Sequence, residues 1–320
     1  MLKRMTVKKI SIATILLFIC FLFVLFPKED KVINLDGKEI IEYSSNSLEH
    51  EIFMVNKDNY VAKCNVKIED NKDVTDKVRT LLEYLIIGGK KESEIPNGFR
   101  SIIPSGTEIK SIELKEGLLK IDFSKEILEI DANLEESMLE AIVYSLTSIK
   151  EVKGIVIYVE GELLTVLPKS KTNLPTILDR NIGINKVYNI DSIDNITKTT
   201  IYYLSKNNDN YYYYVPVTNV DNSSNEKIEI IIDELSKGPN MDNLMSFLNI
   251  NTKLLNYEIK EKQMVLTFNE DILSSIEDKS ILEEVINTIN YSIDDNYDVN
   301  EVVFRVGEEE ILKNVLKTLD

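Results

Sequence analysis

Residues 111–123 read SIELKEGLLKIDF, and the alternation of apolar and polar side chains in this stretch decides the fold class. Apolar residues take every second position on both sides of a turn, at Ile112, Leu114, Leu119, Ile121 and Phe123. A period of two is typical of strands that bury one face, so the stretch predicts a β-hairpin. The same alternation recurs 145 residues further on, at Tyr257, Ile259, Met264, Leu266 and Phe268. We therefore infer two copies of one structural unit.

The elements around this hairpin recur in the same order. Each copy opens with an extended stretch, residues 52–68 and 201–217, in which an Asn/Asp turn indicates a further hairpin. Helices are predicted where apolar residues are spaced i, i+3, i+4 and i+7. The first carries Val78, Leu81, Leu82 and Leu85, repeated 150 residues later by Ile228, Ile231, Ile232 and Leu235. The second carries Leu139, Ile142, Val143 and Leu146, repeated 143 residues later by Leu282, Val285, Ile286 and Ile289.

A strand of β-branched residues closes each copy, IVIYV at 155–159 and VVFRV at 302–306. The predicted order in each copy is thus β-hairpin, helix, β-hairpin, helix and strand. This order predicts an α+β fold with helices packed against a sheet. We place the first domain at residues 50–168, an ordered connector at 169–195 and the second domain at 196–320.

The N-terminal region carries the signals for membrane attachment. Residues 10–26 are uncharged and mostly apolar, and as a helix they would reach roughly 25 Å, at the short end of what spans a bilayer. They follow a basic tail, residues 1–9, and precede a polar linker, residues 27–49. No small-residue cleavage site follows, and basic flanks stay in the cytoplasm, so we predict an uncleaved single-pass transmembrane signal anchor with extracytoplasmic domains. Lipidation of Cys20 is the alternative, which the bulky Ile19 disfavours.

The acidic balance narrows the range of partners. The formal net charge is −17, and the first 27 residues hold four basic and no acidic side chains, so the remainder carries −21. Such a surface repels nucleic acid and anionic lipid headgroups. We therefore expect no nucleic acid among the partners, and contact with the membrane only through residues 10–26.

The glycine pair in LIIGGKKESEIPNG, residues 85–98, raises the question of a phosphate-binding loop. Such a loop follows a strand, has spaced glycines and opens a helix, whereas here a helix is predicted before the glycines. The equivalent stretch of the second copy, ELSKGPN, contains Gly-Pro, which ends helices because glycine accepts the left-handed conformation and proline cannot continue the helix. Gly88 and Gly238 are thus predicted to end equivalent helices.

The sequence marks no catalytic, cofactor-binding or metal-binding residue. His50 is the only histidine, so every histidine-dependent mechanism would rest on it, and a solvated side chain is the better interpretation. Cys64 stands alone in the predicted external part, which favours a packed strand residue over a nucleophile. Asp294, Asn296 and Asp298 have the spacing of a calcium loop without its glycine and glutamate, so a solvated turn fits better. No carboxylate pair is marked for glycoside hydrolysis.

Four tyrosines in succession, residues 211–214, form the clearest aromatic signal. Aromatic rings could stack on sugar or peptidoglycan. In a strand, however, successive side chains alternate faces, so two tyrosines are predicted to pack inward and two to face water. We favour packing.

Several stretches of the first copy resemble the GerMN domain, a sporulation and spore germination module of bacterial envelope proteins. They are LLEYLIIGG at 81–89, GFRSIIPSGTEIKSIELKEGLLKIDFS at 98–124 and LEAIVYSLTSIKEVKGIVIYVEGE at 139–162. Members of the family typically have a leucine-rich helix ending in glycine, an IP-x-GT turn, a hairpin ending in a DFS-like stretch and an A-I-V-x-T/S-L-T helix. The second copy keeps the apolar pattern but has LNINT at 248–252 where the first has IPSGT.

The resemblance implies a non-enzymatic, membrane-anchored protein that acts in sporulation or germination, outside the cytoplasm or between the membranes of a developing spore. Tandem members look like assembly or localisation factors for envelope complexes, and the domain is similar to ring-building modules of secretion-like channels. The better-known tandem members look like lipoproteins, whereas this chain has a spanning segment. We expect envelope or sporulation membrane proteins as partners and no cofactor. Peptidoglycan binding is the second hypothesis, and wall hydrolysis is the third.

Overall fold

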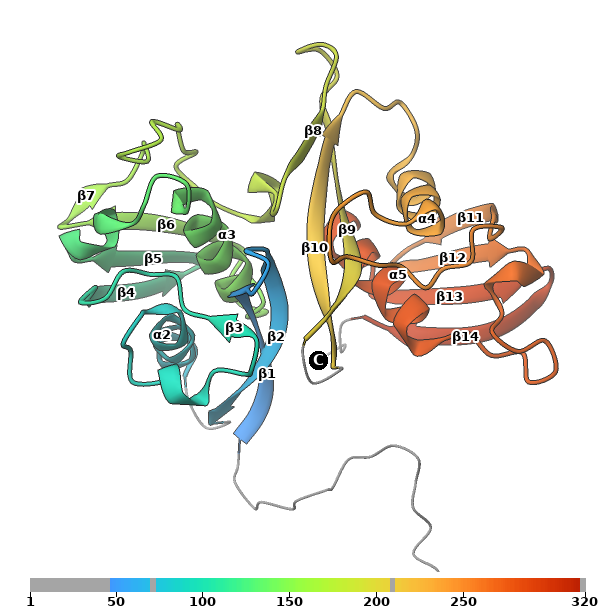
Figure 1. The fold of residues 1–320 in the computed structure, drawn as a ribbon, viewed down its shortest axis with the longest axis horizontal. Helices are drawn as coiled ribbons and strands as arrows, with labels where there is room; N and C mark the ends of the chain where they lie inside the picture. The colour runs from blue at the N-terminus through green and yellow to red at the C-terminus, as the bar shows by residue number, and fades with distance from the viewer. Residues whose placement is uncertain (1–46, 70–72, 208–210, 317–320) are drawn as a thin grey trace, which may run out of the picture. The chain divides into compact units, whose positions relative to one another are not determined.

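The computed structural model describes residues 47–69, 73–207 and 211–316 (Figure 1). The predicted anchor at 10–26 and Cys20 lie outside these residues. Within the described ranges, every helix is too short or too polar to cross a bilayer.

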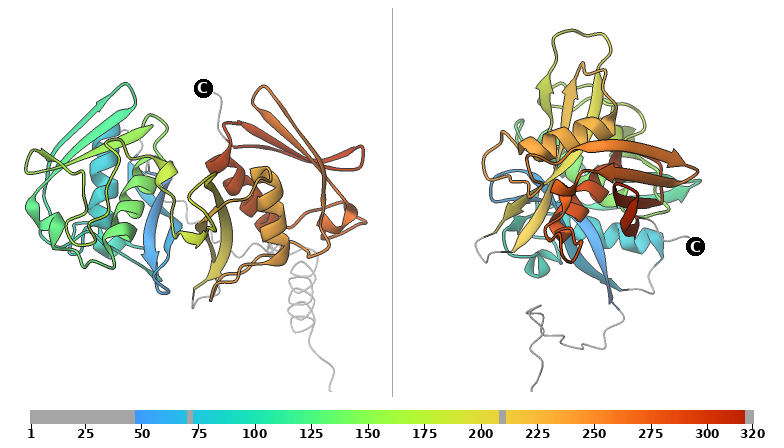
Figure 2. Two further views of the ribbon diagram at one scale, coloured as in Figure 1. Left: turned by 90° about the horizontal axis from the view of Figure 1, so that it is seen from above. Right: turned by 90° about the vertical axis from the view of Figure 1, so that its right-hand side faces the viewer.

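The first copy contains two helices between a hairpin and a sheet. Its elements are β1 (Ser47–Asn56), β2 (Val61–Glu69), α2 (Val74–Leu85), β3 (Phe99–Arg100), β4 (Ile109–Lys115), β5 (Leu118–Phe123), α3 (Glu135–Leu146), β6 (Gly154–Val159) and β7 (Glu162–Leu163), with 3-10 turns at Glu92–Glu94 and Lys125–Glu129. β4, β5, β6 and β7 form a four-stranded sheet in that order, in which only β5 and β6 are parallel. α2 and α3 lie between this sheet and the β1–β2 hairpin (Figure 2).

The second copy repeats this arrangement. Its elements are β9 (Thr197–Lys206), β10 (Tyr212–Asp221), α4 (Lys227–Lys237), β11 (Leu254–Lys260), β12 (Gln263–Phe268), α5 (Glu283–Asn296), β13 (Glu301–Val306) and β14 (Glu309–Val315), with a 3-10 turn at Glu270–Ile272. β11 to β14 form a four-stranded sheet in chain order. The prediction ended each copy with one strand, whereas β7 and β14 add an antiparallel edge strand after it. β7 has only two residues, and the apolar residues of β14 are Ile311, Leu312 and Val315, so no apolar alternation marks either edge.

The two opening hairpins join in one sheet with the order β3-β1-β2-β10, and β9 and β8 (Val187–Asn189) both pair with β10. β2 and β10 are each the second strand of their hairpin, and they pair antiparallel at Lys63 and Tyr214. Because equivalent strands pair antiparallel, the two hairpins are related by a local two-fold axis. The connector also contains a 3-10 turn, Arg180–Ile182.

Burial in the first helix of each copy follows the predicted stripe. The eight apolar positions spaced 150 residues apart are at most 3% exposed, namely Val78, Leu81, Leu82, Leu85, Ile228, Ile231, Ile232 and Leu235. They belong to two hydrophobic cores, one centred on each copy. Each core therefore rests on an amphipathic helix.

The predicted alignment of the second helix was wrong by one turn. Ser145 Oγ of α3 accepts a hydrogen bond from the Phe53 N–H, and Ser292 Oγ of α5 accepts one from the Tyr202 N–H, both at 2.9 Å. Phe53 and Tyr202 occupy the same place in β1 and β9, so the two helices correspond at a shift of 147 residues instead of 143. An error of four residues preserves the apolar period of a helix, which is why the pattern alone did not reveal it.

Both glycines predicted to end helices adopt the left-handed conformation. Gly238 caps α4 with φ 77°, and its N–H donates to the Glu234 carbonyl at 3.0 Å. The cap of α2 is Ile86, and Gly88 follows two residues later with φ 72°. The next residue is constrained as well, because a Cβ on Gly89 would lie 2.4 Å from the carbonyl oxygen of Glu83. The glycine pair thus serves the backbone turn after α2.

Candidate functional site at the junction of the two copies

His50 lies on β1 and is half-buried, which differs from the predicted solvated side chain. Its Nε2 is 3.3 Å from Ser148 Oγ, a hydroxyl that is also within 3.0 Å of the carbonyl oxygens of Glu51 and Ser145. One hydroxyl proton cannot serve all these acceptors, so the pair lacks the fixed geometry of a base and its nucleophile. Burial lowers the pKa of His50, against the opposing effect of Glu51.

We expect the chain to lose stability relative to His50→Gln as the pH falls below 6.5, the ordinary histidine pKa. Because burial lowers the folded-state pKa, the unfolded chain binds a proton in this range that the folded chain does not, and acid therefore favours unfolding. The difference in the free energy of unfolding between the parent chain and His50→Gln should change by at most about 1.4 kcal/mol per pH unit. Urea unfolding of both chains at about pH 7.5 and about pH 5 measures it. A difference that does not change with pH would contradict the expectation.

The residues with calcium-loop spacing serve the fold instead. Asp294 and Asn296 lie in the last turn of α5, so the predicted solvated turn was wrong for them. Asn296 Nδ2 donates to the Thr200 carbonyl at 2.6 Å, and its Oδ1 accepts from the Thr200 N–H at 3.2 Å, which ties α5 to β9. Asp298 pairs with Lys262 at the surface. In the parts of the chain that the structure describes, no group of three or more His, Cys, Asp or Glu residues could hold a metal ion.

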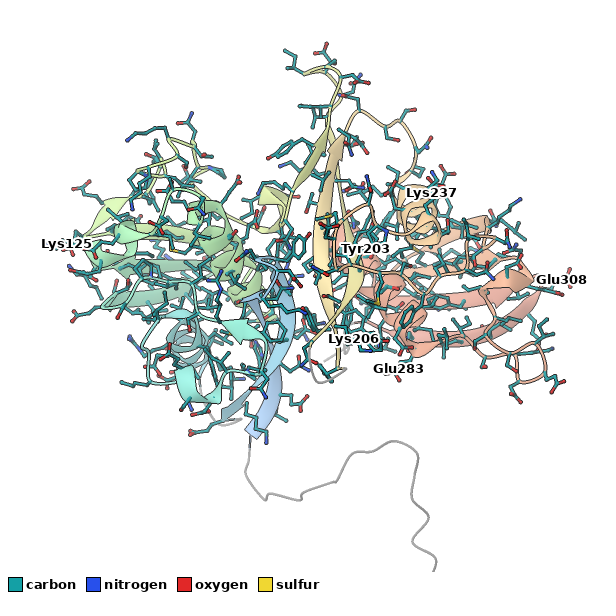
Figure 3. The ribbon with its side chains drawn as sticks, viewed as in Figure 1. Lys125, Tyr203, Lys206, Lys237, Glu283 and Glu308 are labelled. Carbon is teal, nitrogen blue, oxygen red and sulfur yellow. The ribbon has the colours of Figure 1, made fainter. Side chains whose placement is uncertain are left out.

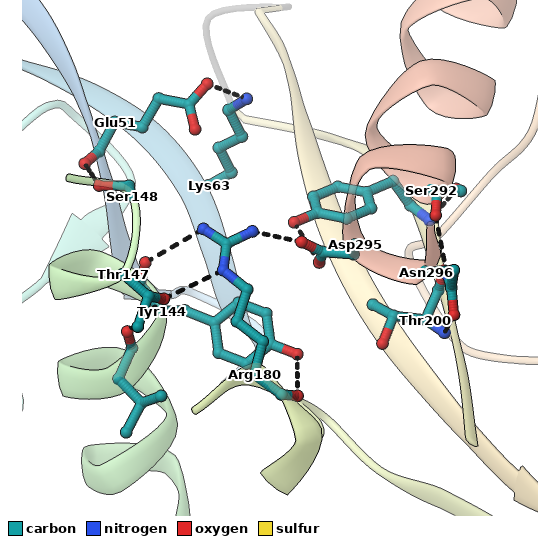
Figure 4. A network of polar contacts seen from close by, with 12 residues as sticks. Glu51, Lys63, Tyr144, Thr147, Ser148, Arg180, Thr200, Ser292, Asp295 and Asn296 are labelled. Atoms are coloured by element: carbon teal, nitrogen blue, oxygen red, sulfur yellow. Dashed lines mark hydrogen bonds and ion pairs between the residues drawn. The ribbon is translucent and has the colours of Figure 1, made fainter. Parts of the chain in front are cut away.

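Arg180 of the connector joins the two copies (Figure 4). Its guanidinium forms an ion pair with Asp295 of α5, whose side chain is 2% exposed, and donates to Thr147 Oγ1 at 3.1 Å. It also lies over the ring of Tyr144, 5.0 Å from the centroid. The second carboxylate oxygen of Asp295 accepts from the Tyr202 hydroxyl at 2.8 Å. This buried network connects the connector with α3 of the first copy and with α5 and β9 of the second.

Asn185 fills the gap in the sheet beside the β2–β10 contact. Its Oδ1 accepts from the Val61 N–H at 2.9 Å, and its Nδ2 donates to the carbonyls of Val61 and Pro216, each at 2.7 Å. Proline has no N–H to offer a neighbouring strand, so the sheet cannot continue there by an ordinary ladder. The Asn185 N–H donates to Glu140 of α3 at 3.0 Å, and Lys186 forms an ion pair with the same carboxylate. The connector is thereby fixed to both copies.

A second cation, Lys63 of β2, is also buried at the junction, with its side chain 7% exposed. It is paired with Glu51, and its Nζ lies 3.4 Å from the centroid of the Tyr291 ring on α5. Burial lowers the pKa of Lys63, and Glu51 acts in the opposite direction. A basic strand residue of one copy is therefore covered by an aromatic residue of the other.

A groove of about 410 Å³ opens next to Lys63, where β2 and β10 separate; we call it the junction groove. Its lining residues are Glu49, Lys63, Cys64, Asn65, Pro96, Asn97, Phe99, Asn207, Tyr211, Tyr212, Tyr213, Tyr214 and Tyr291. All four tyrosines of the sequence run reach this groove. Tyr211 is exposed, Tyr212 and Tyr214 are half-buried and Tyr213 is buried, so the predicted two-in, two-out division was too simple.

Cys64 is half-buried on β2, packs against the first core and lines the junction groove. Burial raises the pKa of its thiol, which disfavours the reactive thiolate form. The structure thus agrees with a packed strand residue.

Sequence reasoning missed the residues that build the junction. Arg180 and Asn185 are single polar residues in a connector rich in Asn and Asp, and their partners on α5 and β10 lie 115 and 31 residues away in sequence. A positive signal existed only for Pro216, because a proline within a strand marks an interrupted ladder.

Comparison with known proteins agrees with this architecture. Residues 51–165 and 200–312 match the sequence profile of the Germane family, described as sporulation and spore germination. The spore germination protein GerM of Bacillus subtilis (strain 168) is 29% identical over 281 residues, which cover 85% of this chain and 75% of that protein. The solved tandem GerMN domains of the sporulation protein GerM from Bacillus subtilis superpose with a TM-score of 0.75 at 28% identity, over 83% of this chain and 93% of that one. The two matched ranges correspond to the two structural copies, and the chain belongs to the Germane family of sporulation and spore germination proteins, with two GerMN domains in tandem.

Proposed function

We propose that the chain is a non-enzymatic protein of the cell envelope that acts in sporulation or spore germination as an assembly or localisation factor. Residues 10–26 anchor it in the membrane as a single pass, and the two domains lie outside the cytoplasm, where they bind envelope or sporulation membrane proteins. Membership of the Germane family, described as sporulation and spore germination, supports a role in one of these processes. The apolar N-terminal run supports the anchor.

The loop between β8 and β9, residues 190–196, supports a role in protein interaction; we call it the tip loop (Figure 1). Ile193 at its centre is 88% exposed, and Ile190 and Ile196 are more than two-fifths exposed. The loop is nonetheless held in place, because Asn222 Oδ1 accepts from the N–H groups of Asp191 and Ser192, at 2.8 and 3.3 Å. Three exposed isoleucines within one seven-residue loop offer apolar surface that another protein could cover.

The polar junction supports the same role in another way. Arg180, Asn185 and Lys186 link both copies to the connector, so the two domains present their surfaces in a fixed relation. A fixed relation suits a protein that positions others, because preorganised surfaces bind without an ordering cost.

We expect Ile193→Asp to impair sporulation or germination while the chain still folds and accumulates. Loss of one buried isoleucine contact corresponds to about tenfold weaker binding or more. Ile276→Asp is the matched control, since Ile276 is 69% exposed on a loop of the second copy. Counts of heat-resistant spores, germination rates and immunoblots measure the effect. Equal phenotypes of the two variants would exclude the tip loop as a protein-binding site. Normal sporulation and germination after deletion of residues 50–320 would refute the assembly or localisation role altogether.

Peptidoglycan binding is the second candidate, which the junction groove favours because its tyrosines could stack on sugar rings. Purified sacculi provide the test. If the full chain in detergent is not retained by sacculi, or if Tyr211→Ala leaves retention unchanged, this candidate is excluded.

A further inference from the structure

The lining of the junction groove shows that it runs along strand edges. Tyr211, Tyr212, Tyr213 and Tyr214 follow one another in sequence, as do Lys63, Cys64 and Asn65 on the opposite wall. Successive side chains of a strand point to opposite faces of the sheet. A groove that touches both faces of two strands must therefore lie between their edges.

The backbone ladder ends where this groove begins. Among the described residues, β10 pairs with β2 only at Tyr214, and Tyr212 and Tyr213 pair with β9 alone. On the other side of this contact, Asn185 and then β8 occupy the same edge of β10. The edge of β10 is thus covered from Tyr214 to Asp221. Before Tyr214, among the described residues, Tyr212 presents its N–H and C=O to the open edge, whereas Tyr211 and Tyr213 face β9.

We propose that the junction groove binds an extended segment of a partner protein, which adds as a strand to the open edge of β10. A free edge offers N–H and C=O groups at the spacing of a strand, and pockets between its side chains select alternate residues of the added segment. This inference rests on the proposed interaction role and assigns it a second contact site, separate from the tip loop.

The chemistry of the groove defines the segment. Five tyrosine rings and Phe99 supply apolar surface, and the positive charge of Lys63 is already matched by Glu51. The remaining charged group on the wall is the carboxylate of Glu49. Aromatic faces attract cations, and the chain beyond its first 27 residues carries −21. The segment therefore alternates apolar or aromatic residues with Lys or Arg.

A photo-crosslinking residue, p-benzoylphenylalanine, at position 211 of the full chain tests the proposal in sporulating cells. Tyr211 is 65% exposed at the groove, and Leu255 on β11, 60% exposed, is the control position. We expect position 211, and not position 255, to crosslink to one protein through a segment of the stated composition.

Other outcomes separate the inference from the role on which it rests. Crosslinks from position 211 to glycan, released by a muramidase, would overturn the peptide segment in favour of the wall. A crosslink from position 193 of the tip loop without one from 211 would leave the interaction role standing and overturn the groove. If neither position 193 nor position 211 crosslinked to a protein, and spores were normal after deletion of residues 50–320, both the interaction role and the groove proposal would be refuted.

A synthetic peptide of the crosslinked segment then tests strand addition itself. In an added strand every second N–H faces the edge, so proline at one set of alternate positions should weaken binding to the full chain roughly fivefold each. Proline at the other set should change binding less. Fluorescence anisotropy of the labelled peptide gives these ratios, and loss of binding that follows side-chain identity alone, without this alternation, would contradict a strand.

Discussion

Replacing Arg180 by methionine is expected to lower the free energy of unfolding by about 3–5 kcal/mol, the usual effect of removing one partner from a buried ion pair. Methionine fills a similar volume but leaves the carboxylate of Asp295, which is 2% exposed, without its counter-charge. The Thr147 hydroxyl loses a donor as well. Urea unfolding of the parent and the variant measures the loss. The comparison holds when the free energy of unfolding falls with urea concentration at the same slope in both chains.

A double variant separates the charge effect from lost packing. Asp295→Asn combined with Arg180→Met removes both charges and keeps an acceptor for the Tyr202 hydroxyl, so it should be more stable than Arg180→Met alone. Lys237→Met is the surface control, because Lys237 pairs with Asp233 on the exterior of α4 (Figure 3). That change should cost less than about 1 kcal/mol. If Arg180→Met were equally mild, the network at the junction would not contribute to stability.

Local periodicity explains which parts of the fold the sequence could predict. Leu119, Ile121 and Phe123 alternate in the sequence and are fully buried in β5, because a strand buries every second side chain whatever lies elsewhere in the chain. The stripe on α2 follows from the helical period in the same way. Both predictions needed only residues within a dozen positions of each other.

The junction could not be predicted because its contacts are long-range and polar. The partners of Arg180 and Asn185 are defined only once the two hairpins meet at Lys63 and Tyr214. The correct alignment of α5 with α3 is also revealed by a tertiary hydrogen bond, from the Tyr202 N–H to Ser292 Oγ, which no periodicity encodes. The tyrosine run was visible, but its place at a strand edge became clear only when β2 and β10 were seen to separate.

Asn185→Asp is expected to destabilise the chain by about 2–4 kcal/mol at neutral pH, because buried carbonyl groups lose their donor and face a negative charge instead. Aspartate keeps the size of asparagine and its tolerance of the left-handed backbone, here φ 45°. It still accepts from the Val61 N–H, but it cannot donate to the carbonyls of Val61 and Pro216. Glu140 beside it adds a like charge.

The loss should depend on pH in a direction that identifies its cause. The neighbouring carbonyls and Glu140 raise the folded-state pKa of the introduced carboxyl above its unfolded value of about 3.9. A group with a raised folded pKa favours the folded chain below its unfolded pKa, and this advantage is lost as the pH rises through the folded pKa. The variant should therefore approach the parent in stability near pH 4 and fall behind it towards pH 7. Asn195→Asp, at an exposed site with φ 54°, should show no such trend. Parallel behaviour of the two variants would mean that Asn185 does not complete the sheet, whereas divergence with rising pH is the result expected if its amide replaces the strand that Pro216 excludes.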